Sequence, residues 1–191
     1  MNRNMNRNAS PGEVMRQFQG IQHVSGCCVR PGSAPYLQQV WHSVLLRACK
    51  PKHCASCSAV LLYWGLAENG WEFVGAAPVS TGSPVRYEHF TTPLGVFDHT
   101  MSNPDFRAEG TKNKLGFRGY GRKGLRVYNS GWVEAPRSWG DGAMGKMRLQ
   151  MHATDSALAA PKLGTAQSEG CVCRPATLNT FIDRHGLLDA G

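Results

Sequence analysis

The residues best suited to covalent chemistry lie near the end of the chain, where Ser168 to Arg174 read S-E-G-C-V-C-R. A cysteine attacks as its thiolate, so it needs a neighbouring base or positive charge. Glycine directly before Cys171 permits a sharp turn that exposes N–H groups to a developing oxyanion. His152 ends the alternating run M-R-L-Q-M-H, and fifteen residues separate it from Ser168. The pattern predicts a Cys/His nucleophile, with two unreactive buried thiols as the alternative.

Two other uses of cysteine compete with a nucleophile. A disulfide between Cys171 and Cys173 would close a strained small ring, which disfavours a structural staple but leaves a reversible thiol switch open. The segment from Cys49 to Cys57 carries C-x4-C-x2-C, whereas a zinc site commonly takes two well-spaced pairs of ligands. Ordinary thiols are the favoured interpretation, and the sequence predicts no metal site.

The elements that must position these residues are mostly strands. Two β-type runs, 58–64 and 71–79, flank Asn69-Gly70, which suits a hairpin. The further strand candidates are Leu94–Phe97, Leu125–Tyr128, Trp132–Glu134 and Met147–His152. The glycine-rich segment 116–124 lacks the flanking strand and helix of a phosphate-binding loop, so it is expected to be a surface or substrate-side loop.

Helices are predicted at two places. The apolar residues of segment 35–50 recur at helical spacing, which predicts one amphipathic helix that packs on its own domain or binds a partner. Pro175 opens a second helix, which Gly186 can close. Residues 1–57 are therefore expected to form a poorly defined extension with one helix.

Composition sets broad limits on function. The 191 residues carry a net charge of +8, which suits anionic partners. No helix-turn-helix, zinc-finger or RNA-binding signature accompanies the charge, so no nucleic-acid partner is predicted. No run is long and apolar enough for a membrane span. The first ten residues, MNRNMNRNAS, contain no apolar stretch typical of a secretory signal.

Two motifs in this order resemble the L,D-transpeptidase catalytic domain of bacterial peptidoglycan cross-linking enzymes. The first is Val79-Ser80-Thr81-Gly82 followed by T-P-L-G-V-F at 92–97; the second is His152, a fifteen-residue spacer and Ser168-Glu169-Gly170-Cys171-Val172. The helical segment P-A-T-L-N-T-F-I-D-R-H-G after the cysteine is similar to one branch of the family. The resemblance covers residues 58–191, which it identifies as a catalytic domain.

The resemblance implies a β-sandwich with a cleft, few short helices and a two-step acyl transfer. Cys171 would attack a donor stem tetrapeptide and release D-alanine, and a neighbouring stem would accept the acyl group in a 3-3 cross-link. His152 would move the proton, Ser168 would hold the loop or orient the histidine, and Gly170 with Cys171 would supply oxyanion-hole amides. Arg174 and Thr92 would bind substrate. No metal or cofactor is implied, and the expected location is the periplasm or cell envelope.

Three residues depart from the family pattern. Cys173 stands two positions after the nucleophile, where the family often has arginine, and the arginine follows as Arg174. In an extended segment this one-residue step turns a side chain to the opposite face. Glu169 replaces a frequent histidine, and a nearby carboxylate raises a thiol pKa. These departures leave open a catalytically weak or inactive peptidoglycan-binding module of the same fold.

Overall fold

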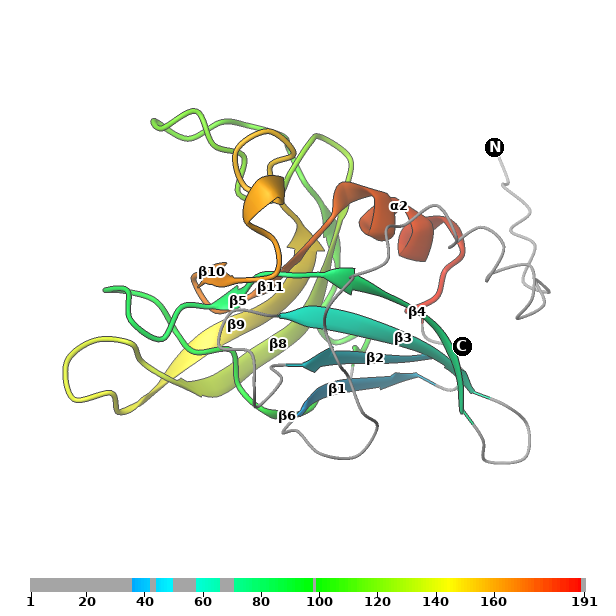
Figure 1. Cartoon of the computed structure of the whole chain (residues 1–191), viewed down its shortest axis with the longest axis horizontal. Helices are drawn as coiled ribbons and strands as arrows, with labels where there is room; N and C mark the ends of the chain where they lie inside the picture. The colour runs from blue at the N-terminus through cyan, green and yellow to red at the C-terminus, as the bar shows by residue number, and fades with distance from the viewer. Residues whose placement is uncertain (1–35, 42–43, 50–57, 66–70, 98, 190–191) are drawn as a thin grey trace.

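The computed structural model describes residues 36–41, 44–49, 58–65, 71–97 and 99–189. Strands dominate these residues, and their single α-helix lies close to the C-terminus (Figure 1). The predicted class, mainly β with few short helices, is confirmed. No helix within the described residues combines the length and the apolar content needed to cross a bilayer.

The larger sheet has five strands in the order β4-β3-β2-β1-β6. Neighbours in β1 to β4 are antiparallel, and β6 joins β1 in parallel. Its strands are β1 (Tyr36–Trp41), β2 (Val44–Cys49), β3 (Ala59–Gly65), β4 (Trp71–Pro78) and β6 (Gly95–Val96). The predicted pair 58–64 and 71–79 is confirmed as the antiparallel strands β3 and β4.

The predicted helix at 35–50 is wrong, because this segment forms β1 and β2. Trp41 pairs with Val44, and Cys49 pairs with Ala59 of β3. Backbone hydrogen bonds to β3 and β6 replace those a helix would make within itself, so sheet pairing overrides the helical spacing of apolar residues. This sheet contains strands from both sides of residues 57 and 58, where the sequence analysis placed the boundary between extension and catalytic domain. That boundary stays a prediction.

The second sheet has four strands in the order β11-β9-β8-β7 and carries the cysteine motif. Its strands are β7 (Phe106–Arg107), β8 (Arg126–Pro136), β9 (Met144–Ala153) and β11 (Val172–Arg174). The two predicted strands 125–128 and 132–134 are one strand, β8, whose register shifts between Asn129 and Trp132. Gly131 takes a φ of +81° at this bulge, a conformation that glycine permits.

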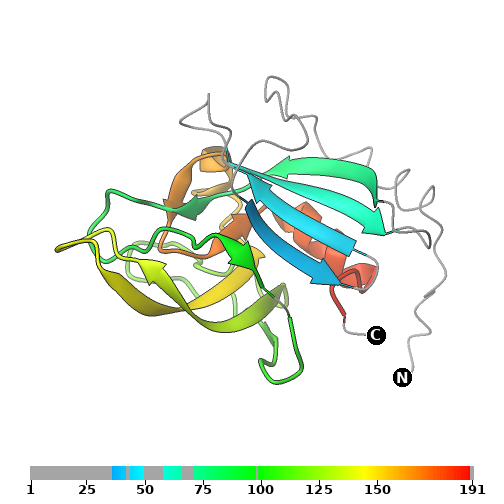
Figure 2. The same cartoon turned by 90° about the horizontal axis from the view of Figure 1, so that it is seen from below.

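The remaining elements connect and cover the sheets. A two-stranded parallel ladder joins β5 (Thr81–Gly82) to β10 (Ala166–Ser168), and a 3-10 turn, η1 (Ala160–Lys162), precedes β10. The helix α2 (Ala176–Arg184) begins after Pro175, and Gly186 follows its end with a φ of +59°, which confirms the predicted C-terminal helix. Figure 2 shows α2 lying across one face of the five-stranded sheet.

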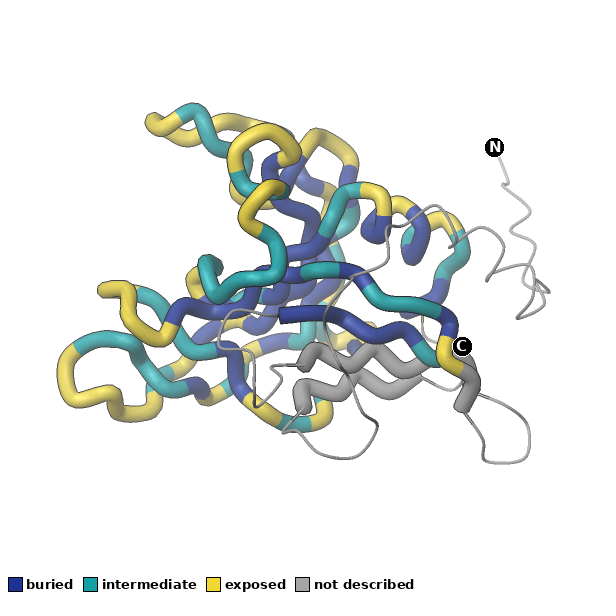
Figure 3. The backbone as a smooth tube through the Cα atoms, in the orientation of Figure 1, coloured by how far each residue is buried: buried dark blue, intermediate teal, exposed yellow. Residues whose placement is uncertain are grey.

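One apolar core joins both large sheets and the helix. It includes Val60 and Leu62 of β3, Leu149 and Met151 of β9, and Ile182 of α2. Figure 3 shows this buried region where the two sheets come together, with exposed loops around it. Alternate residues of β9 therefore face the core, which leaves the face with Arg148, Gln150 and His152 for the cysteine loop.

Candidate active site

The parallel pairing of β9 and β11 sets the centre of the site. Cys173 lies opposite His152 in the register of these strands, and Cys173 Sγ is 3.8 Å from His152 Nε2. His152 Nδ1 donates to the Ala153 carbonyl oxygen at 2.7 Å, which leaves Nε2 as the acceptor of a neutral imidazole. The thiol nearest to the histidine is therefore that of Cys173.

Burial controls the charge of this imidazole. His152 is 5% exposed, and burial lowers its pKa to about 4, with the Arg174 cation acting in the same direction. The ring of Tyr120 packs edge-on against it, with ring centres 4.8 Å apart. At neutral pH the imidazole is therefore uncharged, and its lowered pKa makes it a weaker proton acceptor than a solvent-exposed histidine.

Cys171 lies directly before β11 and is less buried than Cys173. Its thiol donates to the Arg148 carbonyl oxygen, with Sγ and oxygen 3.7 Å apart. Burial raises the pKa of Cys171 to about 11, and the Glu169 carboxylate adds to this rise. The effect expected of Glu169 is thus present, but desolvation is the larger cause. Burial also raises the pKa of Cys173.

Ser168 and Gly170 form the turn that presents Cys171. Ser168 Oγ donates to the Cys171 carbonyl oxygen at 2.5 Å and accepts from the Gly170 amide at 3.2 Å. Gly170 has a φ of +136°, and a Cβ there would come within 2.7 Å of the Met147 side chain. Ser168 thus hydrogen-bonds within the turn as both donor and acceptor, and its role in a reaction stays a prediction. The Gly170 amide is engaged by Ser168, so Cys171 remains the candidate donor for an oxyanion.

The two sequence motifs meet at this loop. Thr92 Oγ1 donates to the Gly170 carbonyl oxygen at 2.7 Å and accepts from the Gly82 amide at 2.7 Å. A Cβ at Gly82 would overlap the Phe90 carbonyl oxygen. The Phe90 amide in turn donates to the Glu169 carbonyl oxygen at 3.1 Å. Thr92, which is 9% exposed, supports the cysteine loop from within the protein.

Arg174 lies on the opposite face of β11 from Cys173 and is 0% exposed. Its guanidinium carbon is 4.6 Å from the centre of the Tyr128 ring. None of its three side-chain nitrogens has a hydrogen-bond partner among the described residues. The predicted role of Arg174 in binding substrate does not fit this position, because the one-residue step along the strand directs the side chain into the core.

Two further residues belong to the site. Tyr120, from the glycine-rich segment 116–124, donates its hydroxyl to Gln150 Oε1 at 3.1 Å. Burial raises the pKa of Tyr120, and the neighbouring Cys171 and Glu169 add to the rise. Gln150 was detectable in the sequence, because it stands two residues before His152 on the same strand face. Nothing in the sequence places Tyr120 on the histidine.

The described residues contain no cluster of three or more His, Cys, Asp or Glu side chains able to hold a metal ion. The side chains of the C-x4-C-x2-C segment lie outside the described residues. The contacts described above place Cys173 and Tyr120 against His152, with Glu169 and Cys171 on the turn before β11. No protein-family model matches the chain, and no curated protein matches it either.

Proposed function

We propose that the protein is a peptidoglycan L,D-transpeptidase with Cys171 as its nucleophile and the family's β-sandwich as its fold. The proposal rests on the motif resemblance and on one observation in particular. The segments 80–92 and 168–171 are distant in sequence, yet Thr92 bonds them together and presents the cysteine beside the strand that carries His152. A wall polymer rich in carboxylates suits the net charge of +8, and the proposed location is the periplasm or cell envelope.

In the first step, Cys171 Sγ attacks the carbonyl carbon of the donor's third residue while His152 Nε2 takes the thiol proton. The bond to the terminal D-alanine breaks, its amine leaves with that proton, and a thioester remains. In the second step, an amine of a neighbouring stem attacks the thioester and loses a proton to His152. The C–S bond breaks, the imidazolium returns the proton to the thiolate, and a 3-3 cross-link is formed.

Cys173 is the rival nucleophile, because its Sγ lies 3.8 Å from the imidazole in the resting protein. Three features favour Cys171. It is the more exposed thiol, it follows the Gly170 turn, and burial raises its pKa less than that of Cys173. In the proposed reaction Cys171 takes the place of Cys173 at Nε2 when substrate binds.

An inactive or weak peptidoglycan-binding module of the same fold is the second candidate function. It is favoured by the Cys171 pKa of about 11, since so few thiolates form at neutral pH. Glu169 adds to this effect. Binding to purified cell-wall sacculi without release of D-alanine would support this candidate over the enzyme.

The test is the intact mass of the full chain after incubation with a carbapenem in the presence of reductant. The wild type is expected to gain one adduct, which Cys173→Ala retains and Cys171→Ala loses. Loss of the adduct in Cys173→Ala alone would transfer the nucleophile to Cys173. A folded wild type with no adduct would favour the binding module.

A further inference from the structure

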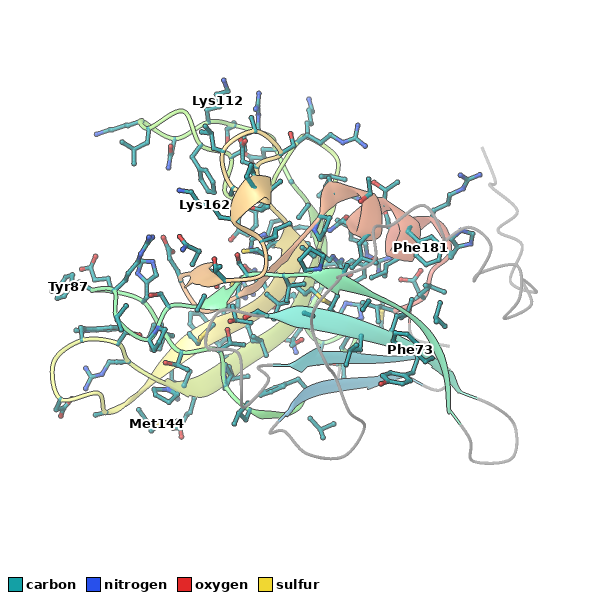
Figure 4. The ribbon with its side chains drawn as sticks, viewed as in Figure 1. Phe73, Tyr87, Lys112, Met144, Lys162 and Phe181 are labelled. Carbon is teal, nitrogen blue, oxygen red and sulfur yellow. The ribbon has the colours of Figure 1, made fainter. Side chains whose placement is uncertain are left out.

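A cavity of about 550 Å³ lies between α2 and the glycine-rich segment 116–124. Arg122 lines it from that segment, and Thr154 and Ser156 line it from beyond β9. The helix α2 completes the lining with the buried ring of Phe181 and the exposed side chain of Arg184. Figure 4 marks Phe181 on α2. The reaction proposed above makes no use of this cavity.

The cavity lies past the ends of the two strands that carry the thiol–imidazole pair. Thr154 stands two residues beyond His152, and Ala176, also in the lining, stands three residues beyond Cys173. Because β9 and β11 are parallel, both run from the thiol–imidazole pair toward the cavity. At ~3.3 Å per residue, Thr154 lies roughly 7 Å beyond His152 along β9, which is within the length of a short peptide.

The cavity carries positive charge that no ion pair among the described residues neutralises. Arg122 and Arg184 are exposed, and neither forms an ion pair with a described residue. The nearby carboxylate of Asp183 already pairs with Arg107 and Arg126.

The other carboxylate near the cavity is also engaged. Asp155 accepts hydrogen bonds from the amides of Ala157 and Leu158 and lies 3.7 Å from a guanidinium nitrogen of Arg118. The N-terminus of α2, where helix dipoles favour negative charge, has no side-chain cap. Among the described residues, no nearby carboxylate is therefore left to pair with the two arginines of this lining.

We propose that the cavity binds an acidic wall peptide, with a carboxylate held between Arg122 and Arg184. This inference rests on the proposed function and names a binding site for its substrate. The volume exceeds that of one small anion, and the apolar lining formed by Ala176 and Phe181 suits the aliphatic part of a peptide. The guanidinium groups supply paired donors that match the geometry of a carboxylate.

The experiment measures binding by calorimetry, in a Cys171→Ala background so that no peptide is consumed. The probe is a synthetic wall-type tetrapeptide that carries two carboxylates and ends in D-alanine. The double variant Arg122→Gln/Arg184→Gln is expected to bind it roughly tenfold more weakly at low salt. Arg122→Lys/Arg184→Lys should recover part of the affinity, and the same peptide with both carboxylates amidated should bind weakly to every variant.

Lys114→Gln, which removes one exposed positive charge from the remote tip of a loop, is the matched control and should bind as the background does. The proposal is overturned if the double variant binds as tightly as this control, or if the background protein does not bind the acidic peptide. The two proposals can fail separately. If the double variant loses binding but the wild type forms no carbapenem adduct, the cavity is still a peptide-binding site and the enzyme function is rejected.

Discussion

Arg174 is a charged side chain that the fold encloses completely. Burial lowers its pKa to about 10, so it stays protonated at neutral pH and the native state bears the cost of desolvating it. The Tyr128 ring offsets part of this cost through a cation–π contact. Arg174→Met keeps a long side chain without the charge, and we expect it to raise the free energy of unfolding by about 1–3 kcal/mol.

Urea denaturation at pH 7 measures this change. Arg122→Met, which alters an exposed arginine, is the control and should stay within about 0.5 kcal/mol of the wild type. A destabilised Arg174→Met would mean that the contact with Tyr128 outweighs the desolvation of the guanidinium.

Glu169 acts on the Cys171 thiol through its charge. Burial is the main cause of the raised Cys171 pKa, and the Glu169 carboxylate adds to it. Glu169→Gln should therefore lower the pKa at which Cys171 reacts, by less than about one pH unit. The rate of alkylation by iodoacetamide, followed by mass between pH 7 and pH 11 in Cys173→Ala protein, measures the shift. Glu134→Gln, an exposed position on β8, should leave the profile unchanged.

At the residue scale, types and spacing in the sequence led to the prediction that His152, Ser168, Gly170 and Cys171 form a site. They were not enough to show which thiol meets the imidazole. That depends on the parallel register of β9 and β11, which sets Cys173 opposite His152. A sequence shows how many residues separate two groups, whereas their contact depends on which strands pair.

The element that carries the site is the turn between β10 and β11, and Thr92 supports it. Thr92→Val keeps the shape of the side chain but leaves the Gly170 carbonyl and the Gly82 amide without their buried partner. We expect unfolding to become easier by about 1–3 kcal/mol, and acylation of Cys171 by carbapenem to slow by about tenfold or more.

Urea denaturation and intact mass against time measure these two effects on the same protein. The matched control is Thr111→Val, at an exposed loop position, which should change neither quantity. Acylation of Thr92→Val at the wild-type rate would show that the turn presents Cys171 without this support.

Elements were predicted well where local chemistry decides them. Pro175 and Gly186 bracket α2, and the apolar runs of β3 and β4 flank Asn69-Gly70. The segment 35–50 was misassigned because its apolar residues satisfy a helical spacing, while its strands depend on partners supplied by β3 and β6. Pairing across the sheet is a long-range property, so the local pattern could not reveal it.

The whole molecule is held together by a core shared between two sheets and one helix, and the mainly β class followed from composition. The order of strands could not be predicted in this way, because it depends on long-range pairing that local sequence patterns do not reveal. One consequence concerns His152, which lies on the β9 face opposite this core and is nevertheless enclosed by the fold. His152 is buried and uncharged, so its chemistry is linked to the stability of the entire fold.

This linkage predicts how stability depends on pH. The native pKa of His152 is about 4, below the usual 6.5, so between these values the unfolded chain binds more protons than the native one. Stability is complete above pH 6.5 and falls as the pH decreases toward 4. The difference corresponds to roughly 3 kcal/mol at full effect.

Urea denaturation at intervals from pH 7 to pH 4 should show this loss in the wild type. His152→Gln should remove most of it, since carboxylates titrate mainly at the lower end of the range. Parallel loss in both proteins would mean that water or a counter-charge reaches the imidazole in the native state, so that burial does not hold its pKa down.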